Sequence, residues 1–161
     1  DISEYKVELM QENFNRCHLN KAKAVAWDAL EPDERWLGQA DVVVADIPCS
    51  GLGVIGRKRD IKYKMTSQAV QDIVELQEKI LKVAASYVKK GGKLLFSTCT
   101  VNKDENEAHV KWIQDTLKMT PVSLNGTLPG LVHSPTTQQG FVQLIPGMQD
   151  TDGFFISVFE K

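Results

Sequence analysis

The sequence predicts an α/β fold in which a largely parallel sheet packs against helices. Two short, almost continuous apolar runs, at 41–46 and 93–97, are typical of strands buried inside such a sheet. Between them, apolar residues recur every three or four positions, which is the spacing of an amphipathic helix. This strand–helix–strand order favours one α/β unit across residues 1–161.

The segment before the first buried run is predicted to hold a helix, a strand and a loop. Apolar residues at loosely helical spacing predict a helix over 2–16, with Ser3 as its N-cap. The short apolar run 22–27 predicts a strand. The polar stretch 32–38 predicts a loop or a short helical turn.

The first buried run and the long helix follow. The run 41–46 predicts a strand covered on both faces, and 47–65 predicts a loop. A helix of about 20 residues is expected to begin at Thr66 or Ser67. The cations and glycines of 89–92 are expected to end it, because cations stabilise a helix carboxyl end and glycine follows it.

The remaining third is predicted to contain one more helix and several short strands. Asn102 and Glu105 have the spacing of a capping box, so a helix is expected from there to Lys118. The proline-rich stretch 119–150 predicts short strands and loops. The aromatic and β-branched run 153–160 predicts a final strand.

The composition excludes several classes of protein. The chain has 161 residues, is 42% hydrophobic and carries a formal net charge of −2, so nucleic-acid binding would need a local basic patch. No apolar run approaches the roughly 20 residues of a membrane helix, and the start does not resemble a signal peptide. We therefore expect no membrane partner, and a chain that begins inside a domain. An odd count of three cysteines argues against a disulfide framework and favours reduced thiols in the cytoplasm.

Two cysteines stand just past the two buried runs. Cys49 lies three residues after Asp46, and Cys99 lies in a Ser-Thr-Cys-Thr stretch. Loops at the carboxyl ends of neighbouring parallel strands form one crevice, so both thiols and the Asp46 carboxylate are expected to converge there. This set suits covalent chemistry on an electrophilic ring carbon, with one thiol attacking and a second group moving protons.

Each of these residues also has a structural interpretation. Asp46 can simply cap the next turn, and free cysteines such as Cys49 and Cys99 are often small core residues. Cys17 follows the first helix and is interpreted as structural.

The histidines do not indicate a metal site. His18, His109 and His133 are scattered, and no Cys-x-x-Cys pair is present, so no metal is expected. His109 lies in the middle of a predicted helix and is expected to face solvent.

Two further acids occupy positions comparable to that of Asp46. Asp28 ends the expected strand 22–27, and Asp1 precedes the first helix. Carboxylates at strand ends fit a ligand whose ribose hydroxyls, exocyclic amine and ammonium group donate hydrogen bonds. The position of Asp1 is also simply where the chain begins.

The densest positive patch follows the glycine-rich stretch 51–56. That stretch lacks the Gly-Lys-Ser/Thr ending of a phosphate loop. The patch is either an ordinary solvated loop or a phosphate contact whose affinity falls with salt, and Tyr63 within it is able to stack on a base. The patch comprises Arg57, Lys58, Arg59, Lys62 and Lys64, with Asp60 as its one acid.

Together these motifs resemble the Sun-type, RsmB-like RNA (cytosine-5)-methyltransferases, whose bacterial members modify 16S ribosomal RNA. The family's Asp-x-Pro-Cys-Ser-Gly motif stands at 46–51, with Ile47 where alanine is more usual. Its Ser-Thr-Cys-Thr motif stands at 97–100 and is followed by Glu-Asn-Glu at 105–107. Lesser matches lie at 53–55, 60–62, 77–81 and 152–156, so the resemblance covers essentially the whole chain.

The resemblance implies a Rossmann-like fold and S-adenosylmethionine as methyl donor. It implies Cys99 as the nucleophile and Cys49 as the group that assists release of the enzyme–base adduct. By position, the cofactor residues are Asp1, Asp28, Asp46 and Pro48, with Asp46 also near the target base. The RNA contacts expected in the basic patch are Arg57, Lys58, Arg59 and Lys62.

One family feature has no counterpart in the sequence. The family's glycine-rich cofactor loop follows the first strand, upstream of the acid that matches Asp1. We therefore expect 1–161 to be a partial catalytic domain that lacks this strand and its loop, to bind the cofactor weakly, and to need the amino-terminal part of the same protein as partner. A non-catalytic RNA-binding or assembly module and a thiol redox protein are the alternative interpretations.

Overall fold

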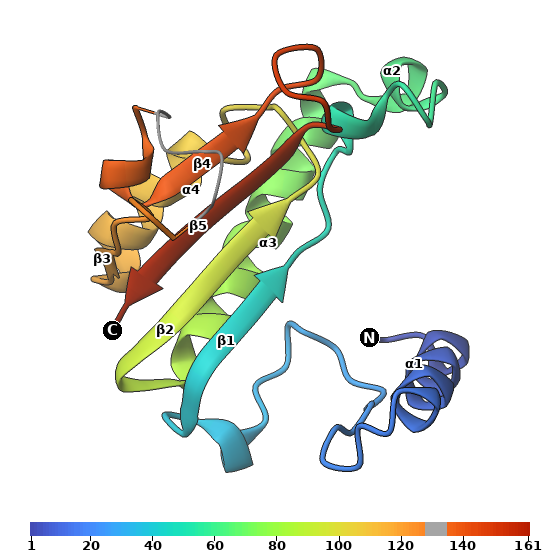
Figure 1. The fold of residues 1–161 in the computed structure, drawn as a ribbon, viewed down its shortest axis with the longest axis vertical. Coiled ribbons are helices and arrows are strands. Elements are labelled where there is room, and N and C mark those ends of the chain that lie inside the picture. Colours follow the sequence, from blue (N-terminus) through green and yellow to red (C-terminus); the bar gives the residue numbers. More distant parts are fainter. Residues whose placement is uncertain (128–134) are drawn as a thin grey trace.

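The computed structural model describes residues 1–127 and 135–161. Within them the core is a five-stranded sheet in the order β1-β2-β5-β3, with β4 also pairing with β5 (Figure 1). The strands are β1 (Ala40–Asp46), β2 (Val88–Thr98), β3 (Thr120–Pro121), β4 (Phe141–Leu144) and β5 (Phe154–Glu160). Only the β1–β2 pairing is parallel in this part of the chain, so the expected largely parallel sheet is in fact mixed.

The helices are α1 (Glu4–Arg16), α2 (Ile61–Lys64), α3 (Ser67–Tyr87) and α4 (Glu107–Trp112). The side chain of Thr66 caps α3 by accepting a hydrogen bond from the Ala69 amide at 3.1 Å. Helix α3 connects the parallel strands β1 and β2, and it lies with α4 on one face of the sheet (Figure 1). The predicted strand–helix–strand unit is therefore confirmed.

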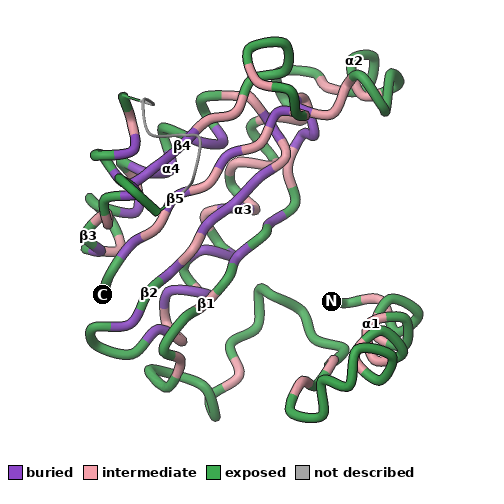
Figure 2. The backbone as a smooth tube through the Cα atoms, viewed as in Figure 1, coloured by how far each residue is buried: buried purple, intermediate pink, exposed green. Residues whose placement is uncertain are grey.

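The core lies between these helices and one face of the sheet. Buried side chains alternate along β2 and β5, as Leu94 and Phe96 do in β2 and Phe155 and Phe159 do in β5 (Figure 2). The expectation that 41–46 is buried on both faces is wrong: Val42 and Val44 are 58% and 64% exposed. Val43 between them packs against the core, and side chains alternate along a strand, so this apolar run forms a strand that is covered on one side only.

The amino-terminal segment agrees with the sequence only in part. Ser3 caps α1 as predicted, but no residue of α1 is buried. The predicted strand at 22–27 is wrong, because in the described residues this segment has no strand beside it. Two hydrogen bonds join this segment to the first residue of the chain. The Trp27 amide donates to the Asp1 carbonyl at 3.0 Å, and the Asp1 amino group donates to the Val25 carbonyl at 3.4 Å.

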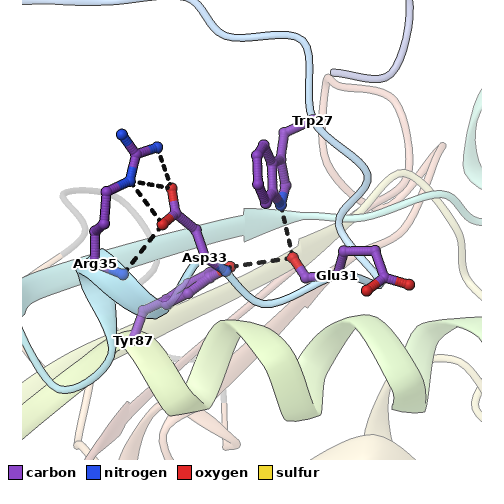
Figure 3. A network of polar contacts seen from close by, with 5 residues as sticks. All are labelled: Trp27, Glu31, Asp33, Arg35 and Tyr87. Atoms are coloured by element: carbon purple, nitrogen blue, oxygen red, sulfur yellow. Dashed lines mark hydrogen bonds and ion pairs between the residues drawn. The ribbon is translucent and has the colours of Figure 1, made fainter.

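A small polar network ties the following loop to α3 (Figure 3). The Trp27 indole donates to the Glu31 carbonyl at 2.6 Å, and the Tyr87 hydroxyl of α3 donates to the same oxygen at 3.5 Å. The Tyr87 oxygen also accepts from the Asp33 amide at 2.8 Å, and Asp33 forms an ion pair with Arg35 at 2.6 Å. The expected helical turn within 32–38 is the short 3-10 helix Glu34–Trp36.

Two predicted boundaries are also corrected. Helix α3 ends at Tyr87, and β2 begins at Val88, so the stretch 89–92 belongs to the strand. It forms an irregularity in the β1–β2 pairing, where Gly91 has a φ of +74° and its amide donates to the Lys161 carbonyl at 2.7 Å. The helix predicted to run to Lys118 is shorter: α4 is followed by a π-helical turn, Ile113–Leu117.

The carboxyl-terminal part of the chain contains short strands and the final strand of the sheet. The stretch 119–150 forms the short strands β3 and β4 with loops where it is described, and the strand at 153–160 is confirmed as β5. Part of 119–150 and His133 lie outside the described residues. No helix of the described residues is long and apolar enough to cross a membrane.

Candidate active site

The loops after β1 and β2 bring two thiols into contact. In the β1–β2 pairing Asp46 lies opposite Ser97, so the chain leaves both strands at the same end of the sheet. The Sγ atoms of Cys49 and Cys99 are 3.2 Å apart, and both residues are partly exposed. The third cysteine, Cys17, is exposed at the end of α1.

The two sulfur atoms do not have the same environment. Burial, and then the hydrogen bond with Cys99, raise the pKa of the Cys49 thiol to about 12. Near neutral pH the Cys49 thiol therefore keeps its proton, and either sulfur atom can be the donor in the hydrogen bond between them. A thiol that holds its proton is a poor nucleophile, because the thiolate is the attacking species.

The Asp46 carboxylate lies at the exposed end of β1, between the two motifs. The Ser97 hydroxyl donates to its Oδ1 at 3.0 Å, and the Ile47 amide donates to the Ser97 carbonyl at 3.3 Å. Pro48 stands next in the loop, and its carbonyl accepts from Gln77 of α3 at 2.8 Å. Strand register and these bonds fix the path of the chain from Asp46 to Cys49.

The other two acids hydrogen-bond within their own turns. Asp1 Oδ1 accepts from the Ser3 amide at 2.9 Å, and its Oδ2 pairs with Lys6 at 3.3 Å. Asp28 Oδ1 accepts from the Leu30 amide at 2.9 Å. The Trp27–Asp1 backbone bond brings these two acids into one region of the chain. Both carboxylates are exposed acceptors, as a nucleoside site requires.

Gly53 lies where the loops that carry the two cysteines pack against each other. Its amide donates to the Cys99 carbonyl at 3.0 Å, and its carbonyl accepts from the Gly153 amide at 2.8 Å. A Cβ at Gly53 would lie 2.8 Å from the Cys99 carbonyl oxygen, and closer still to that of Gly153. Only a residue without a side chain fits here, so Gly53 serves close packing.

The basic patch of residues 57–64 is exposed, and two of its cations are paired. Arg57 forms an ion pair with Asp152 at 2.9 Å, and Lys64 forms one with Asp60 at 2.7 Å. Lys62 lies over the ring of Tyr63, 4.8 Å from its centroid, and Tyr63 is 79% exposed. Lys58 and Arg59 are also exposed. The patch presents cations and an aromatic ring to solvent on the loop that follows Cys49.

Three buried polar residues at this site were not predicted from the sequence. Glu105 was expected to complete a capping box with Asn102, but the carboxylate accepts from the Ser50 amide at 2.8 Å and the Ser50 hydroxyl at 2.5 Å. Gln77 of α3 donates to Glu105 at 3.0 Å, and Asn106 accepts from the Thr98 hydroxyl at 2.6 Å. The signal was present in the sequence, since Glu105 and Asn106 belong to the Glu-Asn-Glu stretch that follows the Cys99 motif.

The prediction that His109 faces solvent is also wrong. His109 is 1% exposed, and its ring stacks on Phe96 with centroids 5.8 Å apart. Burial lowers its pKa below the usual 6.5. In the described residues no group of three or more His, Cys, Asp or Glu side chains has a metal-binding arrangement.

Comparison with known proteins identifies the relatives of this arrangement. Residues 1–160 match the family described as 16S rRNA methyltransferase RsmB/F. The probable ribosomal RNA small subunit methyltransferase B of Bacillus subtilis (strain 168) is 38% identical over 164 aligned positions, which cover 100% of this chain and 36% of that protein. The chain therefore spans about a third of the length of this curated relative.

Solved structures give the same result at the level of the fold. The crystal structure of PH0851 superposes with a TM-score of 0.83 at 26% identity, covering 100% of this chain and 36% of that one. NSun6 from Pyrococcus horikoshii, solved with SFG, superposes with a TM-score of 0.78 at 25% identity, covering 100% of this chain and 40% of that one. The mixed sheet with α3 and α4 is thus part of a Rossmann-like methyltransferase fold. This chain belongs to the 16S rRNA methyltransferase RsmB/F family.

Proposed function

We propose that the chain is part of the catalytic domain of an RNA cytosine-5 methyltransferase that modifies small-subunit ribosomal RNA in the cytoplasm. The observation that carries this proposal is the contact between the Cys49 and Cys99 sulfur atoms, 3.2 Å apart at the ends of neighbouring parallel strands. The family description and the name of the Bacillus subtilis relative support ribosomal RNA as the substrate.

Cytosine carbon 5 is too weak a nucleophile to accept a methyl group directly. In the proposed reaction the Cys99 thiolate bonds to carbon 6, which raises the electron density at carbon 5. After methylation, a base removes the proton from carbon 5, the carbon 6–sulfur bond breaks, and the thiolate of Cys99 leaves. The ring must be unstacked for this attack, so the substrate is a loop or a flipped nucleotide.

The environments of the two thiols support this division of roles. Burial raises the pKa of Cys49 to about 12, so its sulfur keeps a proton while Cys99 reacts. A thiol that keeps its proton is a poor nucleophile, which leaves the attack to Cys99. We assign Cys49 to release of the adduct: once its thiol has given its own proton to solvent, the strongly basic Cys49 thiolate accepts the proton from carbon 5. We assign Asp46 to contact with the target base.

S-adenosylmethionine supplies an electrophilic methyl group on a sulfonium, and its analogue SFG accompanies the structure of NSun6. The exposed carboxylates of Asp1 and Asp28 fit the ribose hydroxyls and the adenine amine, which are hydrogen-bond donors. Asp46 and Pro48, on the loop that leads to Cys49, would lie toward the methionine end.

The basic patch is proposed to bind the RNA backbone. Lys58, Arg59 and Lys62 present exposed cations, and Arg57 contributes while paired with Asp152. Because phosphate contacts release counterions, binding should weaken steeply with salt.

A covalent trap tests the proposal. The protein expressed from the complete reading frame that encodes this chain is incubated with S-adenosylmethionine and RNA containing 5-fluorocytosine, whose carbon 5 has no proton to lose. The expected result is an RNA adduct that Cys99→Ala abolishes and Cys49→Ala retains.

Loss of the adduct only in Cys49→Ala would reverse the two roles. Folded protein that binds the RNA without forming any adduct would support a non-catalytic RNA-binding or assembly module. A thiol redox protein would show neither RNA binding nor an adduct.

A further inference from the structure

Glu105 is a fully buried carboxylate next to the two cysteine loops. Its exposed fraction is 0%, and in the described residues no ion pair includes it. Burying a carboxylate without a cation is unfavourable unless several donors satisfy both oxygens. The arrangement of those donors therefore indicates what the carboxylate does.

The donors come from both sides of the site. Oε2 accepts from the Ser50 amide at 2.8 Å and from Gln77 Nε2 at 3.0 Å. Oε1 accepts from the Ser50 hydroxyl at 2.5 Å, with the Thr100 hydroxyl at 3.4 Å. The Ser50 and Thr100 hydroxyl oxygens are themselves 2.8 Å apart. One carboxylate thus joins two loops and helix α3.

Two of these donor residues are chain neighbours of the two thiols. Ser50 directly follows Cys49, and Thr100 directly follows Cys99. The residue before Cys49 is held as well, because Gln77 also donates to the Pro48 carbonyl at 2.8 Å. The backbone on each side of Cys49 is therefore bonded to Glu105 or to its partner Gln77.

The next residue, Asn106, holds Cys99 in a similar way. Its Oδ1 accepts from the Thr98 hydroxyl at 2.6 Å, and its Nδ2 donates to the Thr100 carbonyl at 3.0 Å. Both neighbours of Cys99 are thus bonded to Asn106. The adjacent residues 105 and 106 together fix the backbone around both sulfur atoms.

We propose that Glu105 is a positioning residue that holds the sulfur of Cys49 in register with that of Cys99, acting through Ser50 and Thr100. Within the part of the chain that the structure describes, its hydrogen bonds go to Ser50, Gln77 and Thr100 and to neither sulfur atom, so it positions the reacting groups without being catalytic. The significance of this role for catalysis rests on the proposed function, because Cys49 and Cys99 must act on the same cytosine ring from fixed positions.

A carboxylate suits this role because both of its oxygens accept hydrogen bonds. Glutamine offers one acceptor oxygen and an NH₂ group, so the Ser50 hydroxyl would have to turn toward Thr100 to keep the network bonded. Alanine leaves the buried Ser50 amide without its acceptor, and the loop should open to water. Glutamine should therefore restore part of what alanine removes.

Alkylation of the three cysteines tests the proposal. The chain is treated with iodoacetamide at about pH 8, and the rates at Cys49, Cys99 and the exposed Cys17 are followed by peptide mass spectrometry. Glu105→Ala should raise the rate at Cys49 about tenfold relative to Cys17, because a pKa lowered by one unit gives about ten times more thiolate. Glu105→Gln should lie between Glu105→Ala and the wild type.

The pH profile separates positioning from general destabilisation. In both Glu105 variants the midpoint of the pH profile of Cys49 alkylation should move to lower pH than in the wild type, while the midpoint of Cys17 stays in place. The matched control is Glu107→Ala, which makes the same substitution at an exposed residue of the same stretch and should change neither rate. A folded Glu105→Ala chain whose Cys49 reacts at the wild-type rate would overturn the proposal.

Ser50→Ala provides the test if Glu105→Ala does not fold. It removes the hydroxyl donor, keeps the carboxylate and the amide bond, and should raise the Cys49 rate about threefold. An unchanged rate in this variant would also overturn the proposal. Because alkylation needs neither RNA nor cofactor, its outcome is independent of the 5-fluorocytosine trap, which tests the proposed function.

Discussion

At the scale of single residues, the site depends on how closely the backbones of the loops around Cys99 approach one another. The Gly53 amide binds the Cys99 carbonyl at 3.0 Å, and the Gly153 amide binds the Gly53 carbonyl at 2.8 Å. Three loops therefore meet with no space for a side chain at position 53. Their packing sets the position of the Cys99 backbone.

Gly53→Ala should therefore destabilise the fold by about 1–3 kcal/mol, because the new Cβ would overlap backbone atoms that cannot rotate away. Urea unfolding measures this change. Gly56→Ala is the matched control, since no atom lies within 4 Å of a Cβ at that position. Equal stability of the two variants would contradict the close packing of these loops.

Part of the site could be predicted from the sequence alone, and part could not. The contact between Cys49 and Cys99 could be anticipated, because each cysteine follows a buried run that ends at the same edge of a sheet. The proposed role of Glu105 could not be anticipated, because the spacing of Glu105 from Asn102 also fits a capping box. Which arrangement forms depends on burial, since the Ser50 and Gln77 donors reach Glu105 only after the loops have packed.

At the scale of elements, α4 is attached to the sheet through an aromatic cluster. The His109 ring stacks on Phe96 of β2 and lies 6.1 Å from the Trp112 ring on its own helix. His109 Nε2 is buried without a hydrogen-bond partner in the described residues. Burial therefore favours the neutral imidazole and lowers its pKa.

This burial predicts a pH dependence of stability. The folded pKa of His109 is below 6.5 and the unfolded chain has the ordinary value, so the unfolded state binds the proton more readily. The stabilisation is complete above about pH 6.5 and is lost as the pH falls from there through the folded pKa. Free energies of unfolding in urea, measured between about pH 5 and pH 8, report this loss.

The substitution His109→Phe keeps the ring and removes the titrating group, so it should reduce the loss of stability at acid pH. The control is His18→Asn, which removes an exposed histidine whose φ of +57° asparagine tolerates. If the loss of unfolding free energy at acid pH disappears in His18→Asn and persists in His109→Phe, the pH dependence does not come from His109.

The elements that the sequence predicted wrongly share a cause. The run 22–27 has the composition of a strand, but a strand needs a neighbour, and in the described residues only the Asp1 backbone lies beside it. The stretch 89–92 has the signals of a helix end, but its backbone pairs with Lys161 at the carboxyl terminus. Pairing with distant residues decided both cases, and local composition does not report it.

At the scale of the whole molecule, the sheet is covered by helices on one face only in the described residues. Helices α3 and α4 cover that face, while Val42 and Val44 on the other are more than half exposed (Figure 1). The segment that carries Asp1 and Asp28 is not part of the sheet. The relatives are about three times as long as this chain, and a full cofactor site is expected only in a protein of that length.

We therefore predict that the chain of 161 residues binds S-adenosylmethionine too weakly for isothermal titration calorimetry to detect. The physical reason is that Asp1 and Asp28 lie on a segment that, among residues 1–127 and 135–161, no strand pairing fixes relative to Asp46. The protein from the complete reading frame is the control. A dissociation constant in the micromolar range for the chain alone would contradict the prediction.

The proposed chemistry requires both thiols to lie within one site. Diamide removes the hydrogen atoms of two neighbouring thiols and joins their sulfur atoms, which requires the Sγ distance to shrink from 3.2 Å to about 2.05 Å. Peptide mass spectrometry should find one disulfide within the chain, between Cys49 and Cys99, with Cys17 still free. A folded chain that forms only disulfides between molecules through Cys17, or none at all, would contradict the shared site.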